Sequence, residues 1–390
     1  MNEFDDIRPF HDDEVPEVLE RLIADPELLN LLLARQFPRI SQIIPPLFYS
    51  LARPLLRRSL TSLTKDVSTV RDFQRHMTSR LVTILDKTTD SYDFAGLDSL
   101  DPKKAYLFMS NHRDIALDPA IINLGLTDKG RETVRIAIGD NLLSKPFASD
   151  LMRINRSFIV KRSAASRRDK FDALKLLSKY IRQSINKDDV SIWIAQAEGR
   201  AKNGEDKTET ALLKMLALSK SQEQNFTSAI SELNIIPVSI SYEYDPCDGD
   251  KARELYSQKM GLSYIKSIFE DLDSIQKGFV EYKGRIQVTF GQPIKEQYDS
   301  ADSLAKKIDQ QIYLNYKLFP TNIIAWSLSQ EPLDPDQLLE LKSQWPNENW
   351  KAAEILFKTR INGLPRDHQA LAIAAYAAPV FSQLRNLSDD

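Results

Sequence analysis

A histidine and an aspartate in the segment SNHRDIALDPA, residues 110–120, could act together as a general base. The apolar run before this segment is typical of a strand, which would leave His112 in a loop at the strand's end. Asp118 and Pro119 resemble the N-cap and first residue of a helix, so the two side chains could turn toward each other. A carboxylate on one imidazole nitrogen would let the other nitrogen take a proton from a hydroxyl. Asp114 is a competing partner, and the competing interpretation of the pair is that Asp118 only caps and His112 only packs.

Positive charge is concentrated in residues 153–182, where ten Lys or Arg residues stand against two Asp. Lys161 and Arg162 close an apolar run that predicts a strand, and they are candidates for binding phosphate, an acidic protein or an anionic lipid. For residues 167–170, the competing interpretation is an exposed basic helix surface.

A third segment, IWIAQAEGRAKNG, residues 192–204, ends a buried-type strand in Glu198 and Gly199. A glycine there lets the backbone approach a ligand closely. Arg200 offers a bidentate fork and Lys202 a point charge, which together suit a phosphate dianion. The competing interpretation is a surface turn without a ligand.

Other catalytic motifs are incomplete. HRD at residues 112–114 resembles a kinase catalytic loop, but Pro119 stands where that loop needs Asn. Residues 199–206 have the two glycines of a P-loop, but Glu205 and Asp206 replace its Lys and Ser/Thr and would repel phosphate. The four histidines are too widely spaced to predict a metal site; they are His11, His76, His112 and His368.

The composition is that of a globular protein. The 390 residues include 52 Lys and Arg and 55 Asp and Glu, a net charge of −3, with 42% hydrophobic residues. These values exclude wholesale disorder and a uniformly basic nucleic-acid binder. The single cysteine, Cys247, excludes an internal disulfide and a Cys-rich zinc site, and fits a reducing compartment. The acidic start and the lack of a run of about 18 apolar residues predict a cytoplasmic protein, soluble or peripheral on the inner face of a membrane.

The elements that must position these residues indicate an α/β fold class. Residues 1–95 read as a helical N-terminal domain, with no strand expected before Lys104. Residues 96–320 alternate strands and helices and predict a mixed-sheet α/β domain covered by helices, followed by a helical extension over 321–390. The expected strands are 105–110, 134–139, 157–162, 190–195, 235–244 and 285–291.

A fourth segment, NIIPVSISYEY, has Pro237 within a β-branched run and reads as structural or as a wall of an acyl site. In order, the four segments resemble the glycerolipid acyltransferase family, and most closely its soluble plastid-type glycerol-3-phosphate acyltransferases. The family pattern is Asn-His…Asp-Pro, then a basic block, then Glu-Gly-Arg, then Ile-Ile-Pro. The resemblance covers about residues 20–320. This chain departs from the pattern in having five residues, not four, between His112 and Asp118, and in having Lys202 where Arg is common.

The resemblance implies transfer of a fatty acyl group from an acyl carrier protein or coenzyme A thioester to glycerol 3-phosphate, in phospholipid biosynthesis. His112, oriented by Asp118, would be the base, without a metal or another cofactor. The residues implied to hold the acceptor phosphate are Lys161, Arg162, Arg200 and Lys202. Secondary candidates for the site are Asn111, Asp114, Glu198 and Gly199.

Two alternatives stay open. The acceptor could be 1-acylglycerol 3-phosphate (lysophosphatidate), or the chain could be a non-catalytic adaptor that binds phospholipid or a carrier protein. The altered His–Asp spacing is the argument for the adaptor. An apolar stripe near three arginines could also contact a membrane surface peripherally, although packing inside a helical bundle is the favoured interpretation. Its residues are Ile40, Ile43, Ile44, Leu47, Phe48 and Leu51, beside Arg53, Arg57 and Arg58.

Overall fold

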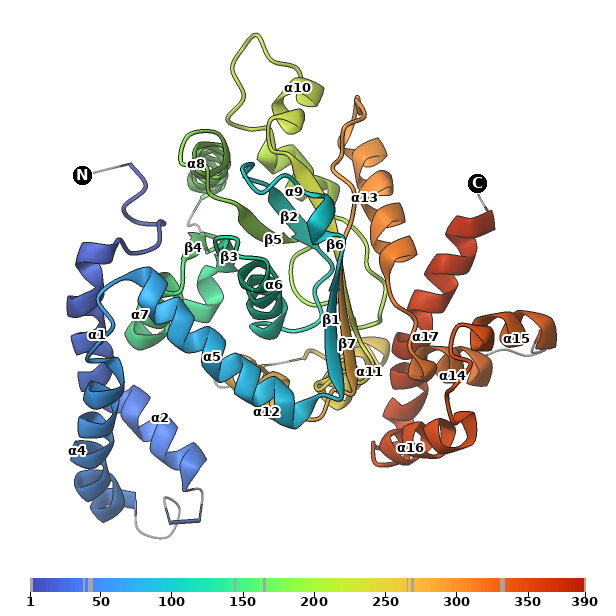
Figure 1. Ribbon diagram of the computed structural model, residues 1–390, viewed down its shortest axis with the longest axis horizontal. Coiled ribbons are helices and arrows are strands. Elements are labelled where there is room, and N and C mark those ends of the chain that lie inside the picture. The colour runs from blue at the N-terminus through green and yellow to red at the C-terminus, as the bar shows by residue number, and fades with distance from the viewer. Residues whose placement is uncertain are drawn as a thin grey trace. The chain divides into compact units, whose positions relative to one another are not determined.

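The computed structural model describes residues 3–37, 39–40, 45–143, 145–163, 166–264, 266–267, 270–329 and 334–388 (Figure 1). The chain forms two compact units. Unit 1 comprises Met1–Leu81 and Val134–Tyr180, and unit 2 comprises Val82–Thr133 and Ile181–Asp390.

Unit 1 is mainly helical. Asp25 accepts the N–H groups of Glu27 and Leu28 and so starts a helix directly after the previous one ends. An apolar core lies between the N-terminal helices and α7 (Pro146–Ile154), with Val15, Phe73 and Phe147 among its buried members. Two parallel strands complete the unit. The elements are η1 (Asp12–Glu14), α1 (Val15–Ala24), α2 (Pro26–Gln36), α4 (Pro45–Thr64), most of α5 (Val70–Thr88), β3 (Arg135–Gly139), η3 (Asp140–Leu143), α7 (Pro146–Ile154), β4 (Ser157–Val160) and most of α8 (Arg167–Asn186).

Unit 2 holds a mixed sheet in the order β1-β7-β6-β2-β5. Strand β6 pairs antiparallel with β7, and the other pairs are parallel. The five strands are β1 (Ser91–Ala95), β2 (Leu107–Ser110), β5 (Ile192–Ala195), β6 (Ile235–Tyr242) and β7 (Arg285–Phe290). Every residue of β2 and β6 is buried, which agrees with the largely apolar sequences of these strands. The predicted mixed-sheet α/β fold and its six strands are confirmed.

The prediction that no strand precedes Lys104 is wrong. Strand β1 pairs in parallel with β7, in the register Ser91 opposite Arg285. It is a five-residue edge strand whose residues alternate between exposed and half-buried, with Asp93 at its centre. The segment has only five residues, and Asp93 disfavours a strand whereas Tyr92 and Phe94 favour one, so the sequence alone does not predict it and its pairing with β7 makes it a strand.

Helices cover the sheet of unit 2. They are η2 (Leu97–Ser99), α6 (Leu117–Asp128), α9 (Thr210–Leu216), α10 (Phe226–Ser231), α11 (Asp248–Lys259), α12 (Glu270–Val280) and α13 (Ala301–Asn315). Helix α6 packs closely on β1, since a Cβ on Gly125 would lie 2.4 Å from the Phe94 ring. This close packing fixes the helix that carries Asp118.

The predicted helical C-terminal extension is confirmed, and it belongs to unit 2. Its helices are α14 (Pro320–Leu328), α15 (Pro335–Ser343), α16 (Trp350–Asn362) and α17 (Arg366–Ser388), coloured orange to red in Figure 1. They share an apolar core that includes Trp326, Phe357 and Tyr376. The domain boundaries near residues 95 and 320 stay predictions. Within the described parts of the chain, no helix is both long enough and apolar enough to cross a membrane.

Candidate active site

His112 and Asp118 form a hydrogen-bonded pair. The imidazole Nδ1 lies 2.9 Å from Oδ2 of Asp118, which is fully buried, whereas the His112 side chain is 14% exposed. The five intervening residues do not separate the pair, because they fold into a turn. The backbone N–H groups of Arg113 and Asp114 donate to the same Oδ2, at 2.6 and 3.0 Å. Asp118 is therefore the carboxylate that contacts the histidine.

Asp114 has a different place in this turn. Its Oδ1 accepts the N–H groups of Ala116 and Leu117, at 3.0 and 2.8 Å, at the start of α6. Asp118 was expected to be the N-cap of that helix, but it is the second helical residue. Asp114 takes the capping bonds, which leaves Asp118 free to face His112. Burial, with a smaller contribution from the Asp118 charge, raises the pKa of Asp114 to about 6.

A tyrosine from β6 completes the surroundings of Asp118. The hydroxyl of Tyr242 donates to Oδ1 of Asp118 at 2.8 Å. Burial, strengthened by the Asp118 charge, raises the pKa of Tyr242 well above its usual value, so the hydroxyl stays a donor. Sequence reasoning missed Tyr242; its position at the end of the fourth segment was the available signal. Four donors thus fix the orientation of one carboxylate.

The second imidazole nitrogen, Nε2, has no hydrogen-bond partner among the described residues. The Trp193 ring packs edge-on against the imidazole, with the ring centroids 5.6 Å apart, and its Nε1–H donates to Ser110 at 2.9 Å. A proton held on Nδ1 by Asp118 leaves a lone pair on Nε2. The arrangement can therefore accept a proton at Nε2.

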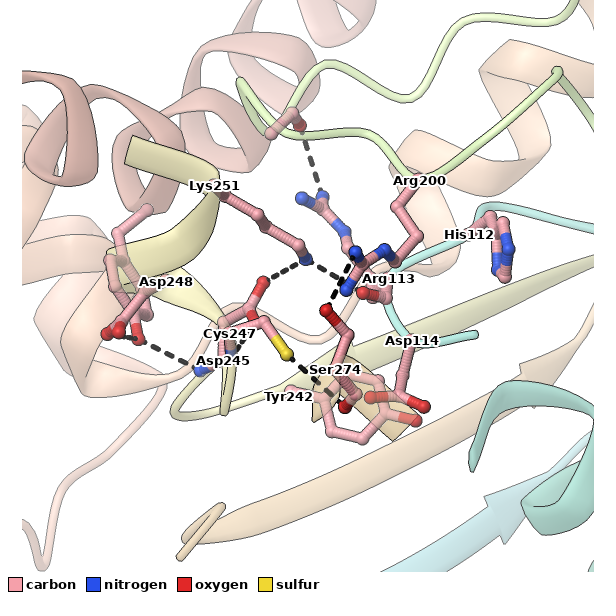
Figure 2. A network of polar contacts seen from close by, with 12 residues as sticks. His112, Arg113, Asp114, Arg200, Tyr242, Asp245, Cys247, Asp248, Lys251 and Ser274 are labelled. Atoms are coloured by element: carbon pink, nitrogen blue, oxygen red, sulfur yellow. Dashed lines mark hydrogen bonds and ion pairs between the residues drawn. The ribbon is translucent and has the colours of Figure 1, made fainter. Parts of the chain in front are cut away.

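The loop after β5 carries Arg200, whose guanidinium reaches toward Ser274 (Figure 2). The same loop is bonded to the backbone of the histidine, since the N–H of Ala201 donates to the carbonyl of His112 at 2.8 Å. Arg200 donates through Nη2 to Ser274 at 3.3 Å, while its buried Nη1 has no hydrogen-bond partner in the part of the chain that the structure describes. A buried guanidinium nitrogen without a partner suits an anionic ligand. Gly199 has φ +79°, and a Cβ there would meet nothing within 4 Å, so the turn faces open space.

The remaining charged residues of the loop differ in availability. Lys202 forms an ion pair with Glu254 of α11, so its charge is already balanced. Glu198, the predicted secondary candidate, is exposed. Arg113, which the sequence did not single out, is buried and donates to Asp206 at 2.6 Å and to the Gly204 carbonyl at 3.1 Å.

Asn111, another secondary candidate, is fully buried. Its amide nitrogen donates to the Ile240 carbonyl at 3.0 Å and to Asp206 at 3.2 Å, and its oxygen accepts the Ile240 N–H at 2.8 Å. These bonds tie the end of β2 to β6. Asn111 thus supports the loop of His112 from within the sheet.

Lys161 and Arg162 follow β4 in unit 1. Nζ of Lys161 lies 3.5 Å from Oδ2 of Asp6. Lys161 and Asp140 both line an open groove of about 780 Å³. The backbone N–H groups of Arg162 and Ser163 both donate to Asp140 at 3.1 Å. Carboxylates therefore accompany this basic pair. The pair belongs to unit 1, while His112, Asp118, Arg200 and Lys202 belong to unit 2.

In the described stretches of the chain, no group of three or more His, Cys, Asp or Glu side chains could hold a metal ion. Cys247 is buried, and burial together with the Asp245 charge raises the pKa of its thiol to about 12. That thiol stays protonated at neutral pH and is a poor nucleophile.

Comparisons with known proteins give one matching family model, which covers part of the chain. No curated protein matches the chain. The 1-acyl-sn-glycerophosphate (LPA) acyltransferase PlsC from Thermotoga maritima is 14% identical, over 74% of this chain and 95% of that one, with a TM-score of 0.35. The signal recognition particle receptor FtsY from Elizabethkingia anophelis, in complex with GDP, is 10% identical, over 70% of this chain and 84% of that one, with a TM-score of 0.21.

Neither structure superposes closely, so the assignment rests on the family model. Residues 91–241 match the model described as Acyltransferase. The stretch runs from the start of β1 into β6 and includes every candidate residue named in advance. Residues 91–241, with the His112–Asp118 pair among them, are therefore similar to an acyltransferase domain.

Proposed function

We propose that this protein is a glycerol-3-phosphate acyltransferase that uses His112 and Asp118 for general-base catalysis. The observation that carries the proposal is the 2.9 Å contact between the two side chains, within the stretch that matches the Acyltransferase model. The donor is a fatty acyl thioester of acyl carrier protein or coenzyme A. The plastid-type resemblance of the sequence favours glycerol 3-phosphate as acceptor.

In the proposed reaction, Nε2 of His112 takes the proton of the acceptor hydroxyl, and the hydroxyl oxygen attacks the thioester carbonyl. The tetrahedral intermediate collapses with cleavage of the C–S bond and formation of the ester. The imidazolium then returns its proton to the departing thiolate. Asp118 holds the proton on Nδ1 throughout and stabilises the imidazolium. No acyl-enzyme is needed, which agrees with the buried, protonated state of Cys247.

The acceptor phosphate is the natural partner for Arg200. Its buried Nη1 has no hydrogen bond to any described residue, and it lies on a loop bonded to the backbone of His112. In the proposed reaction, phosphate held by this loop helps to orient a neighbouring hydroxyl for proton transfer. Lys202 and the pair Lys161 and Arg162 are proposed as further phosphate contacts.

Lysophosphatidate remains the second candidate acceptor, because it carries the same phosphate. The adaptor hypothesis is weaker. It rests on the extra residue between His112 and Asp118, and that residue does not prevent the hydrogen bond between them.

A peripheral membrane contact through α4 is also proposed, for a cytoplasmic enzyme with a lipid product. Leu51 and Leu55 are 65% and 72% exposed, and Arg57 and Arg58 are exposed nearby. Phe48, by contrast, packs on Phe37 with ring centroids 5.9 Å apart. Ile43, Ile44 and the side chain of Leu47 lie outside the described residues. Vesicle co-sedimentation that depends on anionic lipid would test the contact.

The decisive experiment offers both acceptors with both thioester donors and compares the wild type with His112→Ala. We expect one acceptor–donor combination to be active and the variant to lose about 10²–10⁴-fold in kcat. Activity that survives in His112→Ala would refute the general-base role. Silence of the folded wild type in all four combinations, with retained binding of glycerol 3-phosphate, would favour the adaptor.

A further inference from the structure

Lys251 is a buried cation that the proposed reaction does not use. It lies on α11 and is 4% exposed. Its Nζ donates to the backbone carbonyl of Arg113 at 2.7 Å and forms an ion pair with Asp245 (Figure 2). A buried ammonium is costly unless it is paired and hydrogen-bonded, so the arrangement of its partners matters. One of these partners is the peptide next to His112.

The Arg113 residue is held on both sides. Its N–H donates to Asp118 at 2.6 Å, and its C=O accepts from Lys251. Loss of the second contact would loosen the turn that supplies the first. Lys251 therefore acts on the His112–Asp118 pair through the backbone, without touching either side chain.

The C-terminal extension fixes the partner of Lys251. The N–H of Asp245 donates to the Tyr376 hydroxyl of α17 at 2.9 Å, and that hydroxyl donates to Asp248 at 2.9 Å. Arg360 of α16 donates to the Asp245 carbonyl at 2.8 Å. Two helices of the extension thus hold the segment that aligns Lys251.

The extension also contacts the loop after β5, which carries Arg200 and Lys202. Gly204 has φ +80°, and a Cβ there would lie 2.1 Å from the Ala375 carbonyl of α17. The Gly204 carbonyl in turn accepts from Arg113. A cavity of about 30 Å³ lies among these groups, with Lys202, Lys251 and Tyr376 in its wall. Helix α17 therefore supports both the turn after His112, through Asp245, and the loop that carries Arg200, through Gly204.

We propose that Lys251 is a positioning residue for the His112–Asp118 pair, and that α17 sets its position through Tyr376 and Asp245. The kinetic test of this inference rests on the proposed function, because it needs acyl-transfer activity. The structural test needs only the ring signals of His112. The C-terminal extension is then part of the catalytic apparatus, and each of its two contacts affects a different step. Lys251 acts on proton transfer, and Gly204 acts on the loop of Arg200.

The test compares Lys251→Met with Lys277→Met. Lys277 is a matched control, because it also pairs with an aspartate of α11, Asp250 at 2.6 Å, but its side chain is 44% exposed and has no hydrogen bond to the turn among the described residues. We expect Lys251→Met to lower kcat by about 10- to 100-fold with little change in KM for the acceptor, as for a small misalignment of reacting groups. Lys277→Met should match the wild type. Lys251→Met leaves the charge of Asp245 unpaired. The double variant Lys251→Met/Asp245→Asn also removes that charge and so controls for its effect.

Tyr376→Phe keeps the ring packing and removes only the hydroxyl, so it guards against a variant that fails to fold. We expect a smaller fall in kcat in the same direction. Gly204→Ala should instead raise KM for the acceptor. Rates are normalised to the folded fraction, measured by circular dichroism.

A structural readout separates this inference from the proposed function. The ring ¹⁵N shifts of His112, one of four histidines, report whether the proton stays on Nδ1. In Lys251→Met we expect them to move toward values averaged over the two nitrogens, even if the wild type has no acyl-transfer activity. Unchanged ring shifts together with wild-type kcat in Lys251→Met would overturn the positioning role. A fall in rate explained entirely by the unfolded fraction would overturn it as well.

Discussion

The hydroxyl of Tyr242 donates a 2.8 Å hydrogen bond to Asp118, across 124 residues of sequence. Tyr242 ends the central, fully buried strand β6, and Asp118 is the second residue of α6. The strand therefore fixes the far oxygen of the carboxylate whose near oxygen contacts His112. If His112 and Asp118 act as proposed, this bond should affect both the rate of the reaction and the stability of the fold.

Tyr242→Phe should weaken both properties. It leaves Oδ1 of Asp118 buried without a donor, which costs about 1–3 kcal/mol in the free energy of unfolding. The less constrained carboxylate should also lower kcat. Urea denaturation and steady-state kinetics measure the two effects. Tyr282→Phe is the control, because its hydroxyl also donates to an aspartate, Asp90 at 2.5 Å, but on an exposed side chain. Equal losses of activity in the two variants would contradict the prediction.

The two aspartates of the turn should differ sharply in their effect on rate. Asp118→Asn can present an N–H to His112 and so disturbs the tautomer, and we expect kcat to fall by about 10²–10⁴-fold. Asp114→Asn keeps an oxygen for the N–H groups of Ala116 and Leu117, because Asn caps helices nearly as well as Asp. Its effect on kcat should be far smaller. A larger loss in Asp114→Asn than in Asp118→Asn would reverse the assignment of the histidine's partner.

Much of this arrangement could be predicted from local sequence. Six strands are apolar or β-branched runs, and the residues around His112 and Arg200 follow two of them directly. β1 was missed because its strand character comes from pairing with β7. The choice between Asp114 and Asp118 could not be made from spacing, since backbone N–H groups of the turn decide it. Tyr242 and Lys251 approach the turn from more than 120 residues away, so local sequence does not reveal their contacts with it. The position of Tyr242 at the end of the fourth segment was the one available signal.

Stability should depend on pH through Asp114. Its pKa is raised to about 6 in the folded protein, mainly by burial, above the usual value of 3.8. Between about pH 4 and 6 the folded state therefore binds more protons at this group than the unfolded state does. The contribution of Asp114 to the free energy of unfolding is present at low pH and is lost as the pH rises through this window. Above pH 6 it stays constant.

Asp114→Asn isolates this contribution. The neutral amide does not titrate, so the difference in unfolding free energy between variant and wild type should shift in favour of the variant from pH 4 to pH 6. Asp309, whose pKa burial also raises to about 6, is common to both proteins and cancels in the difference. Denaturation curves at intervals across the window give the measurement. A pH-independent difference would show that Asp114 titrates normally.

The cationic residues should contribute unequally to acceptor binding. Arg200 has a buried Nη1 without a partner, whereas the charge of Lys202 is balanced by Glu254. We expect Arg200→Ala to raise KM for glycerol 3-phosphate by about 10-fold or more, the order expected for loss of a charge-assisted hydrogen bond. Arg200→Lys should recover little of this, because an ammonium cannot reproduce the bidentate fork.

Lys202→Ala should raise KM less than Arg200→Ala, since removing Lys202 leaves Glu254 to be solvated instead of leaving a phosphate unpaired. Arg253→Ala on α11 is the control for loss of a half-exposed positive charge in the same unit. Inhibition by inorganic phosphate provides a second measurement, because it reports the anion site without the acyl donor. If Lys202→Ala and Arg200→Ala weakened phosphate inhibition equally, the ion pair with Glu254 would have to open when the acceptor binds.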